Sequence, residues 1–243
     1  DSKKDDRVKV AISTGDVDHA KHVSTILPGM NNVPSEDIGD HVKNAERVRQ
    51  HSIRNAKISS EQVATIAWMY DTPQGGQVVS SKYATKASHE IGSALEGMHA
   101  SRHTNGIERA HTSLLGHSYG STTAGKVAKM IRKGVLDDLV MYGSPGAGAR
   151  DTREYNLDHG RPYVSGIKSD DAVKGKGTLN SKFGNNPMFM PGVKHLANNS
   201  ERDRLFFIPW KMFDRHSEYL EEGTNSLEDI SRVVTKVPVK GER

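Results

Sequence analysis

The segment Leu114–Ser121, LLGHSYGS, decides how the rest of the chain is organised. It places Ser118 between Gly116 and Gly120 in a G-x-S-x-G pattern. A serine raised above a sheet sits on a very sharp strand-to-helix turn, where side chains two residues away on either side would collide. The run 112–115 leads into the serine and a run of small residues, 122–130, follows it, which predicts strand, turn and helix in that order. We therefore expect Ser118 to be a nucleophile raised above the sheet.

Composition excludes several classes of protein and site. The 243 residues include no cysteine, which excludes disulfides, thiol catalysis and zinc sites with cysteine ligands. The net charge of +4 comes from interleaved acids and bases, and the basic residues are neither clustered nor mixed with aromatics, so no nucleic-acid surface is expected. No apolar run approaches the ~18 residues of a membrane span.

The organisation that we expect is a single domain over residues 1–243, with residues 1–7 frayed because they are short and charged. The chain begins with Asp1 rather than methionine, which favours a processed or excised domain and, weakly, a secreted or cell-envelope protein. The oligomeric state has no signature in the sequence.

The hydrophobic pattern alternates between strands and helices. A helix is expected to begin at Pro34 with Ser35 as its N-cap and to run to Ile53. Other helices are expected at 82–101, 121–133 and 226–235, and strands at 8–13, 22–27, 62–69, 112–115, 136–142, 162–167 and 205–208. This alternation predicts an α/β fold in which a mostly parallel central sheet carries helices on both faces.

Five stretches together resemble a known family. They are STGDVDHAKHVSTILPGM (13–30), ATIAWMYDTP (64–73), LLGHSYGSTTAG (114–125), DDLVMYGSPG (137–146) and DRHSEYL (214–220). Their order and spacing resemble the α/β-hydrolase superfamily and, within it, an uncharacterised actinobacterial α/β-hydrolase domain family. The resemblance implies the α/β-hydrolase fold and serine hydrolase chemistry, but no particular substrate.

The resemblance also implies a base and an acid for Ser118, in the chain order serine, acid, histidine. His216 is the expected base because it follows the last predicted strand, and His195 is the second choice, whereas His117 is expected to pack beside the nucleophile. Asp171 is the expected acid, because Asp171-Ala172-Val173 resembles the D-x-V pattern of the family.

Two further aspartates stay open as the acid. Asp170 is the alternative to Asp171, and Asp158 is a distant third. The pair His19 and His22 has no carboxylate pattern around it, so no metal site is expected, and the proposed chemistry needs no cofactor.

An oxyanion hole needs two backbone N–H groups directed at the developing negative oxygen. The first is expected from Tyr119, directly after the nucleophile, where the start of a helix also favours negative charge. The second is expected from Met30, in the loop Pro28-Gly29-Met30-Asn31 after the second strand, although that loop could also be a simple turn.

The long irregular segment 174–202 is expected to be a lid or pocket loop. Its apolar residues Phe183, Met188 and Phe189 are candidates for contact with an apolar substrate group, or they could simply attach the loop to the core.

The function expected from these parts is hydrolysis of carboxylic esters, of the esterase or lipase type, on a small-molecule or lipid ester. An amidase, a peptidase or a thioesterase would use the same machinery. A non-catalytic binding module with this fold is the alternative from a different class, since fold alone does not establish activity.

Overall fold

The computed structural model describes residues 9–166, 182–197 and 218–240. Within them, seven strands form one sheet in the order β1-β3-β2-β4-β5-β6-β7. Their bounds are β1 Val10–Thr14, β2 His22–Leu27, β3 Val63–Met69, β4 His111–His117, β5 Asp138–Tyr142, β6 Pro162–Ser165 and β7 Lys194–His195. Only β1 runs antiparallel to its neighbour, so the predicted mostly parallel sheet is confirmed.

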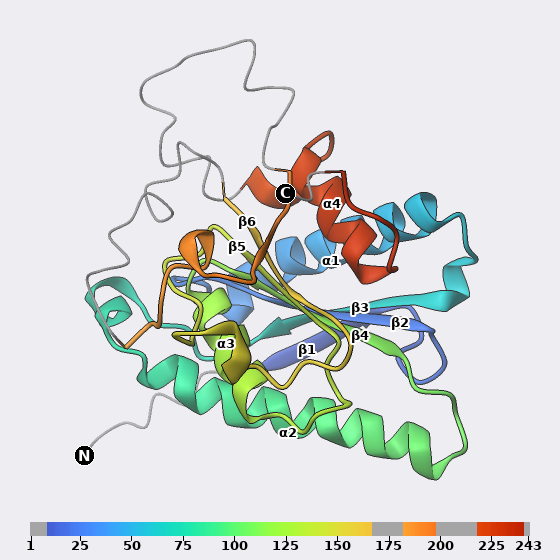
Figure 1. Cartoon of the computed structure of the whole chain (residues 1–243), viewed down its shortest axis with the longest axis horizontal. Helices are drawn as coiled ribbons and strands as arrows, with labels where there is room; N and C mark the ends of the chain where they lie inside the picture. The colour runs from blue at the N-terminus through green and yellow to red at the C-terminus, as the bar shows by residue number, and fades with distance from the viewer. Residues whose placement is uncertain (1–8, 167–181, 198–217, 241–243) are drawn as a thin grey trace.

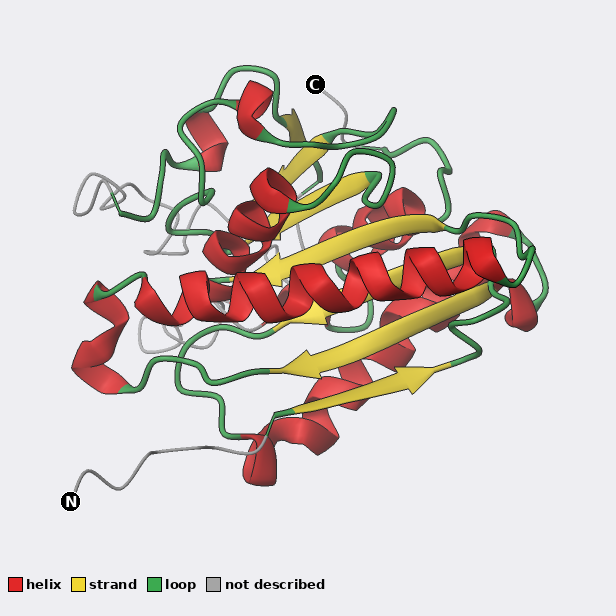
Figure 2. Ribbon diagram, turned by 90° about the horizontal axis from the view of Figure 1, so that it is seen from below, coloured by secondary structure: helices red, strands yellow, loops and turns green. Residues whose placement is uncertain are grey.

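Helices cover both faces of this sheet (Figure 1). Helices α1 (Pro34–Ala56) and α4 (Asn225–Val234) pack together on one face. Helices α2 (Lys82–Thr104) and α3 (Tyr119–Met130) pack together on the other, where α2 runs along the sheet (Figure 2). Short 3₁₀ turns complete the described elements: η1 Ser60–Gln62, η2 Gly75–Val79, η3 Thr152–Glu154 and η5 Pro187–Phe189.

The core forms two layers because adjacent residues of a strand point to opposite faces. In β4, Leu114 packs in the cluster with α2 and α3, whereas Leu115 packs in the cluster with α1 and α4. Both side chains are fully buried. The strand expected before the serine is thus confirmed, and it is buried on both faces through Ser113, Leu114 and Leu115.

Strand register brings three loops to one edge of the sheet. Leu27, the last residue of β2, pairs with Gly116 of β4, and His117 pairs with Tyr142 at the end of β5. Because these strands are parallel, the loop after β2, the turn after β4 and the end of β5 meet at their carboxyl ends.

Some local expectations were wrong. Ser35 does not cap α1: the N-cap is Val33, which has no side-chain cap, and the carboxylate of Asp37 accepts from the Val33 N–H at 2.6 Å. The Asp37 carboxylate thus reaches back to the N–H of the N-cap residue, whereas the contact expected of Ser35, with an N–H of the first turn, is not made by the side chain at the N-cap. Within the segment expected to be irregular, β7 and η5 are regular elements.

Other boundaries shift by a few residues. Strand β1 lies two residues later at its start than expected, and α3 begins directly after Ser118 and ends at Met130. The expected strand at 205–208 lies outside the described residues. No helix in the described part of the chain combines the length and the apolar character needed to span a bilayer.

Candidate active site

Ser118 lies on the turn between β4 and α3 in a backbone conformation that side chains rarely adopt. Its φ is 49° and its ψ is −124°. Such a conformation costs on the order of 1–3 kcal/mol and persists only where its surroundings hold it. Here the Ser118 N–H donates to the carbonyl of Tyr142 at 2.9 Å, and the Ser118 carbonyl accepts from the N–H of Ser121 at 3.0 Å and from its hydroxyl at 2.5 Å.

The glycines of the motif make this turn sterically possible. A Cβ on Gly116 would lie 2.6 Å from the carbonyl oxygen of Gly120, and a Cβ on Gly120 would lie 2.4 Å from the carbonyl oxygen of Pro28. Both distances are shorter than real Cβ contacts allow. The collision expected from the sequence is therefore present, and Gly120 also lets the loop after β2 approach the serine.

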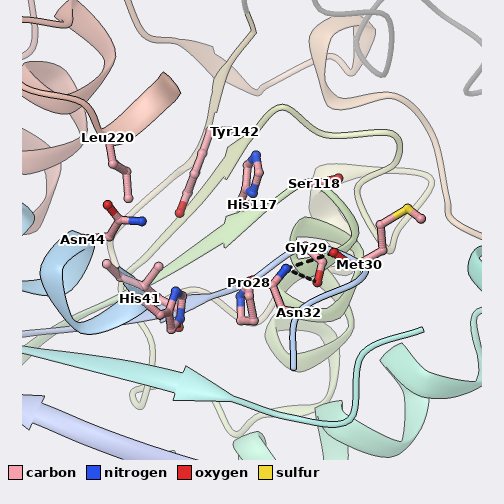
Figure 3. A pocket seen from close by; sticks show the side chains of 11 residues that line it. Pro28, Gly29, Met30, Asn32, His41, Asn44, His117, Ser118, Tyr142 and Leu220 are labelled. Carbon is pink, nitrogen blue, oxygen red and sulfur yellow. Dashed lines mark hydrogen bonds between the residues drawn. The ribbon is translucent and has the colours of Figure 1, made fainter. Parts of the chain in front are cut away.

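That loop lies directly against the serine. A Cβ on Gly29 would come within 3.0 Å of the Ser118 Cβ and 3.5 Å of its Oγ. The side-chain amide of Asn32 donates to the carbonyls of Gly29 at 3.2 Å and Met30 at 2.9 Å, as the dashed lines in Figure 3 show. Asn32 therefore fixes the backbone at the position where an oxyanion donor was expected.

A second loop supports the first. Asn31, at a φ of 61°, donates its N–H to Pro73 at 3.0 Å and accepts from the N–H of Gly75 at 2.8 Å. The hydroxyl of Thr72 donates to the carbonyl of Asn32 at 2.9 Å. Sequence reasoning missed this support, although two asparagines after Pro-Gly are a pattern typical of a left-handed turn residue.

Tyr119 begins α3, and its buried side chain anchors α2. The hydroxyl donates to the Ser80 carbonyl at 2.7 Å and accepts from the Ala84 N–H at 3.2 Å. Burial raises the pKa of Tyr119 to about 12, so the phenol stays neutral. The residue whose amide was expected to face the oxyanion is thus held through its side chain.

A pocket of about 250 Å³ extends from Ser118 between the loop after β2 and α1 (Figure 3). Its polar lining includes Asn32, His41, Asn44 and Tyr142. His41 is buried and its Nε2 lies 3.0 Å from the carbonyl of Ile26; burial lowers its pKa, which favours the neutral ring. Burial also raises the pKa of Tyr142. None of His41, Asn44 and Tyr142 was a candidate from the sequence.

His117 packs beside Ser118, as expected. Its ring stacks on Tyr142 with centroids 5.1 Å apart and an interplanar angle of 23°, and it also meets the ring of Tyr219 at 6.1 Å. His117, the residue between Gly116 and Ser118, therefore forms one wall of the pocket.

The apolar candidates for substrate contact lie away from this wall. The Phe183 ring packs edge-on against Tyr119 at 5.9 Å, Met188 packs against the core, and Phe189 is 78% exposed. None of the three is among the described residues that line the pocket.

Three of the predicted catalytic residues, Asp170, Asp171 and His216, lie outside the described residues. Of the weaker candidates, Asp158 is 3.4 Å from Arg109, near the amino end of β5, and His195 lies in β7. His19 pairs with Asp16 at 2.8 Å, whereas His22 meets the His111 ring at 5.9 Å. The described residues contain no group of three or more metal-ligating side chains that could hold an ion.

Comparison with known proteins identifies the family of this chain. The family model described as alpha/beta hydrolase matches residues 3–181. An uncharacterized protein of Mycobacterium bovis is 30% identical over 202 residues, covering 80% of this chain and 73% of its own length. An uncharacterized protein of Mycobacterium tuberculosis is 33% identical over 184 residues, covering 71% of this chain and 26% of its own length.

Solved structures with a similar course of the chain include two hydrolases. The Bacillus cereus carboxylesterase has a TM-score of 0.47 at 12% identity, with 90% of this chain and 96% of the other covered. The 2,6-dihydroxy-pseudo-oxynicotine hydrolase has a TM-score of 0.49 at 13% identity, with 97% and 67% covered. The match of the family model over most of the chain shows that the protein belongs to the alpha/beta hydrolase family.

Proposed function

We propose that the protein is a serine hydrolase that cleaves carboxylic esters through an acyl-enzyme intermediate. The observation that carries the proposal is the backbone of Ser118, held at a φ of 49° on the turn between β4 and α3 with the Gly29 loop packed against it. Backbone strain of this kind gathers at functional sites, and here it accompanies a serine that lines a pocket beside two candidate N–H donors.

In the proposed reaction, Ser118 Oγ attacks the ester carbonyl carbon while His216 accepts the hydroxyl proton. Asp171, with Asp170 as the alternative, orients His216 and stabilises its cationic form. The amides of Tyr119 and Met30 bind the oxyanion. The C–O bond to the alcohol then breaks, and the alcohol leaves with the proton from His216. Water repeats the sequence on the acyl-enzyme, which releases the acid and restores the serine.

The substrate is proposed to be a small-molecule or lipid ester, and the domain is proposed to extend over residues 1–243. Amides and thioesters could pass through the same steps, so the reaction class has to be measured. A matched panel of an ester, a thioester and an anilide that share one acyl group separates these classes.

We expect the ester to have the highest kcat/KM in this panel, and Ser118→Ala to lower its kcat by at least about 10³-fold. Ser113→Ala is the matched control, since Ser113 is a fully buried serine within β4. Turnover of the ester by Ser118→Ala at the wild-type rate would contradict the proposal. Faster hydrolysis of the thioester or the anilide would leave Ser118 as the proposed nucleophile but would assign the enzyme to a different reaction class.

A further inference from the structure

The pocket beside Ser118 contains a phenol that has no hydrogen-bond partner in the part of the chain that the structure describes. Tyr142 is only 3% exposed, and its hydroxyl makes no hydrogen bond to any described residue. This hydroxyl is not fully enclosed by protein but faces the pocket, where a ligand can supply the partner that the described protein does not. Figure 3 shows this hydroxyl directed towards the side of the pocket that carries Asn44.

The amide of Asn44 has donors to spare at the same end of the pocket. Its carbonyl oxygen accepts from the guanidinium of Arg47 at 3.0 Å, which fixes which end of the amide is oxygen. The amide nitrogen has no hydrogen-bond acceptor among the described residues. A phenol that can donate or accept thus lies near an amide that donates, which together match a ligand hydroxyl.

The tyrosine ring cannot turn away easily. It stacks on His117 at 5.1 Å and contacts the Tyr219 ring at 5.7 Å, so its hydroxyl is aimed by packing on both sides. Ile26 and Leu220 supply apolar surface to the same pocket. The lining therefore combines apolar surface with the polar groups of Tyr142 and Asn44, which lie at the end of the pocket away from Ser118.

Charge and size narrow the ligand further. No Asp, Glu, Lys or Arg is among the described lining residues, so an ionised group would lose its hydration without a counter-charge. The volume of about 250 Å³ exceeds the roughly 150 Å³ that holds a benzene ring. It lies below the range of about 300–1,000 Å³ typical of pockets for drug-sized ligands. A long alkyl chain is therefore a poor fit.

We propose that this pocket selects esters that carry a short, uncharged, hydroxyl-bearing group, with Tyr142 and Asn44 binding that hydroxyl. This inference rests on the proposed function of Ser118. The hydroxyl group can belong to the acyl or to the alcohol side of the ester, and the two arms of the experiment separate these sources.

The acyl arm compares ethyl 3-hydroxybutyrate with ethyl butyrate, and the alcohol arm compares 3-hydroxypropyl acetate with propyl acetate, all followed by titration of the released acid. In one arm we expect the hydroxylated ester to have a kcat/KM about 10-fold higher, as one or two hydrogen bonds provide. Tyr142→Phe keeps the ring stack and should lower that ratio at least about fivefold.

Tyr155→Phe is the matched control. Tyr155 is also a buried tyrosine, but its hydroxyl donates to the Ala147 carbonyl at 2.7 Å and it does not line the pocket. This variant should leave the selectivity ratio unchanged. Ratios near one in both arms of the wild type, or an unchanged ratio in Tyr142→Phe, would overturn the inference.

A binding measurement separates this inference from the proposed function. In Ser118→Ala, NMR titration with the same four esters requires no turnover. We expect one hydroxylated ester to bind more tightly than the matching ester without the hydroxyl. This difference in affinity should disappear in the double variant Ser118→Ala, Tyr142→Phe. That result would support the proposed hydroxyl selectivity even if no ester is hydrolysed. Equal affinities within both pairs would overturn it even if Ser118 proves to be a nucleophile.

Discussion

The two ends of strands β4 and β5 are built on opposite principles. At their carboxyl ends, Ser118 is strained and the Tyr142 hydroxyl lacks a described partner. At their amino ends, charged groups pair closely: His111 Nε2 lies 2.9 Å from Asp138, and Arg109 donates to Asp137 at 2.9 Å. At one end a phenol faces a pocket, whereas at the other the charged groups pair with one another.

The amino-end cluster, defined here as Arg109, His111, Asp137 and Asp138, has the chemistry of a structural ion-pair network. His111 Nδ1 also lies 3.4 Å from Asp137, and both His111 contacts act as ion pairs rather than as straight hydrogen bonds. Asp137 further accepts from the Thr112 N–H at 2.8 Å. Clusters of titratable groups are often interpreted as active sites, yet here the end that carries Ser118 and the pocket is the better candidate.

The largest loss of activity is expected when a methyl group is added at Gly120, in the turn that carries Ser118. Gly120→Ala places a Cβ within 2.4 Å of the Pro28 carbonyl and 2.7 Å of the Leu27 carbonyl, so the loop carrying the proposed oxyanion donor must move. We expect kcat/KM for an ester to fall about 100-fold, as a displacement of about 1 Å can cause, with stability lowered by about 1–3 kcal/mol.

Gly97→Ala is the control for this substitution, and we expect it to have the smallest effect of the proposed variants. Gly97 lies in α2, and a Cβ there would meet nothing within 4 Å. Alanine should stabilise the helix by up to about 1 kcal/mol and leave ester hydrolysis unchanged. Wild-type activity in Gly120→Ala would show that the turn at Ser118 tolerates the displaced loop. It would contradict the claim that close packing at this end of the strands is needed for activity.

An intermediate effect is expected at the paired end, as a dependence of stability on pH. Burial opposes charge on His111, but its contacts with Asp137 and Asp138 outweigh burial and raise its pKa from 6.5 to about 9. A group whose pKa is raised by folding stabilises the fold fully below pH 6.5, and this stabilisation is lost as pH rises through 9. The free energy of unfolding should fall by up to about 3 kcal/mol across this window.

Urea titrations from pH 6 to 9.5 measure this slope. His111→Gln removes the titrating group and should flatten the slope, while ester hydrolysis per folded molecule stays at the wild-type level because the cluster lies away from Ser118. Equal slopes in the two proteins would show that the cluster does not hold a proton as described.

The sequence predicted the parts of the site that depend on local sterics. A serine between two glycines needs one kind of turn, and the Pro-Gly loop after β2 follows from the position of that strand. Tyr142, Asn44 and His41 could not be predicted in the same way. They reach the pocket through the register of β4 with β5 and the packing of α1 on the sheet, which depend on contacts distant in sequence.

Local patterns also failed where two residues compete for one role. Ser35 is a favoured N-cap type, but it lies inside α1, whose N-cap is Val33, and the Asp37 carboxylate reaches back to the Val33 N–H. The adjacent acids Asp137 and Asp138 resembled an ordinary strand start. Their partner His111 lies some 26 residues earlier, so no local pattern indicates the ion pair.

Labelling of the wild-type protein with a fluorophosphonate, followed by mass spectrometry of the modified peptide, tests the central claim most directly. A nucleophile held on a strained turn and activated by a base should give one adduct, on Ser118, and Ser118→Ala should give none. An unlabelled wild-type protein, or an adduct on a different serine that also supports ester hydrolysis, would contradict the account.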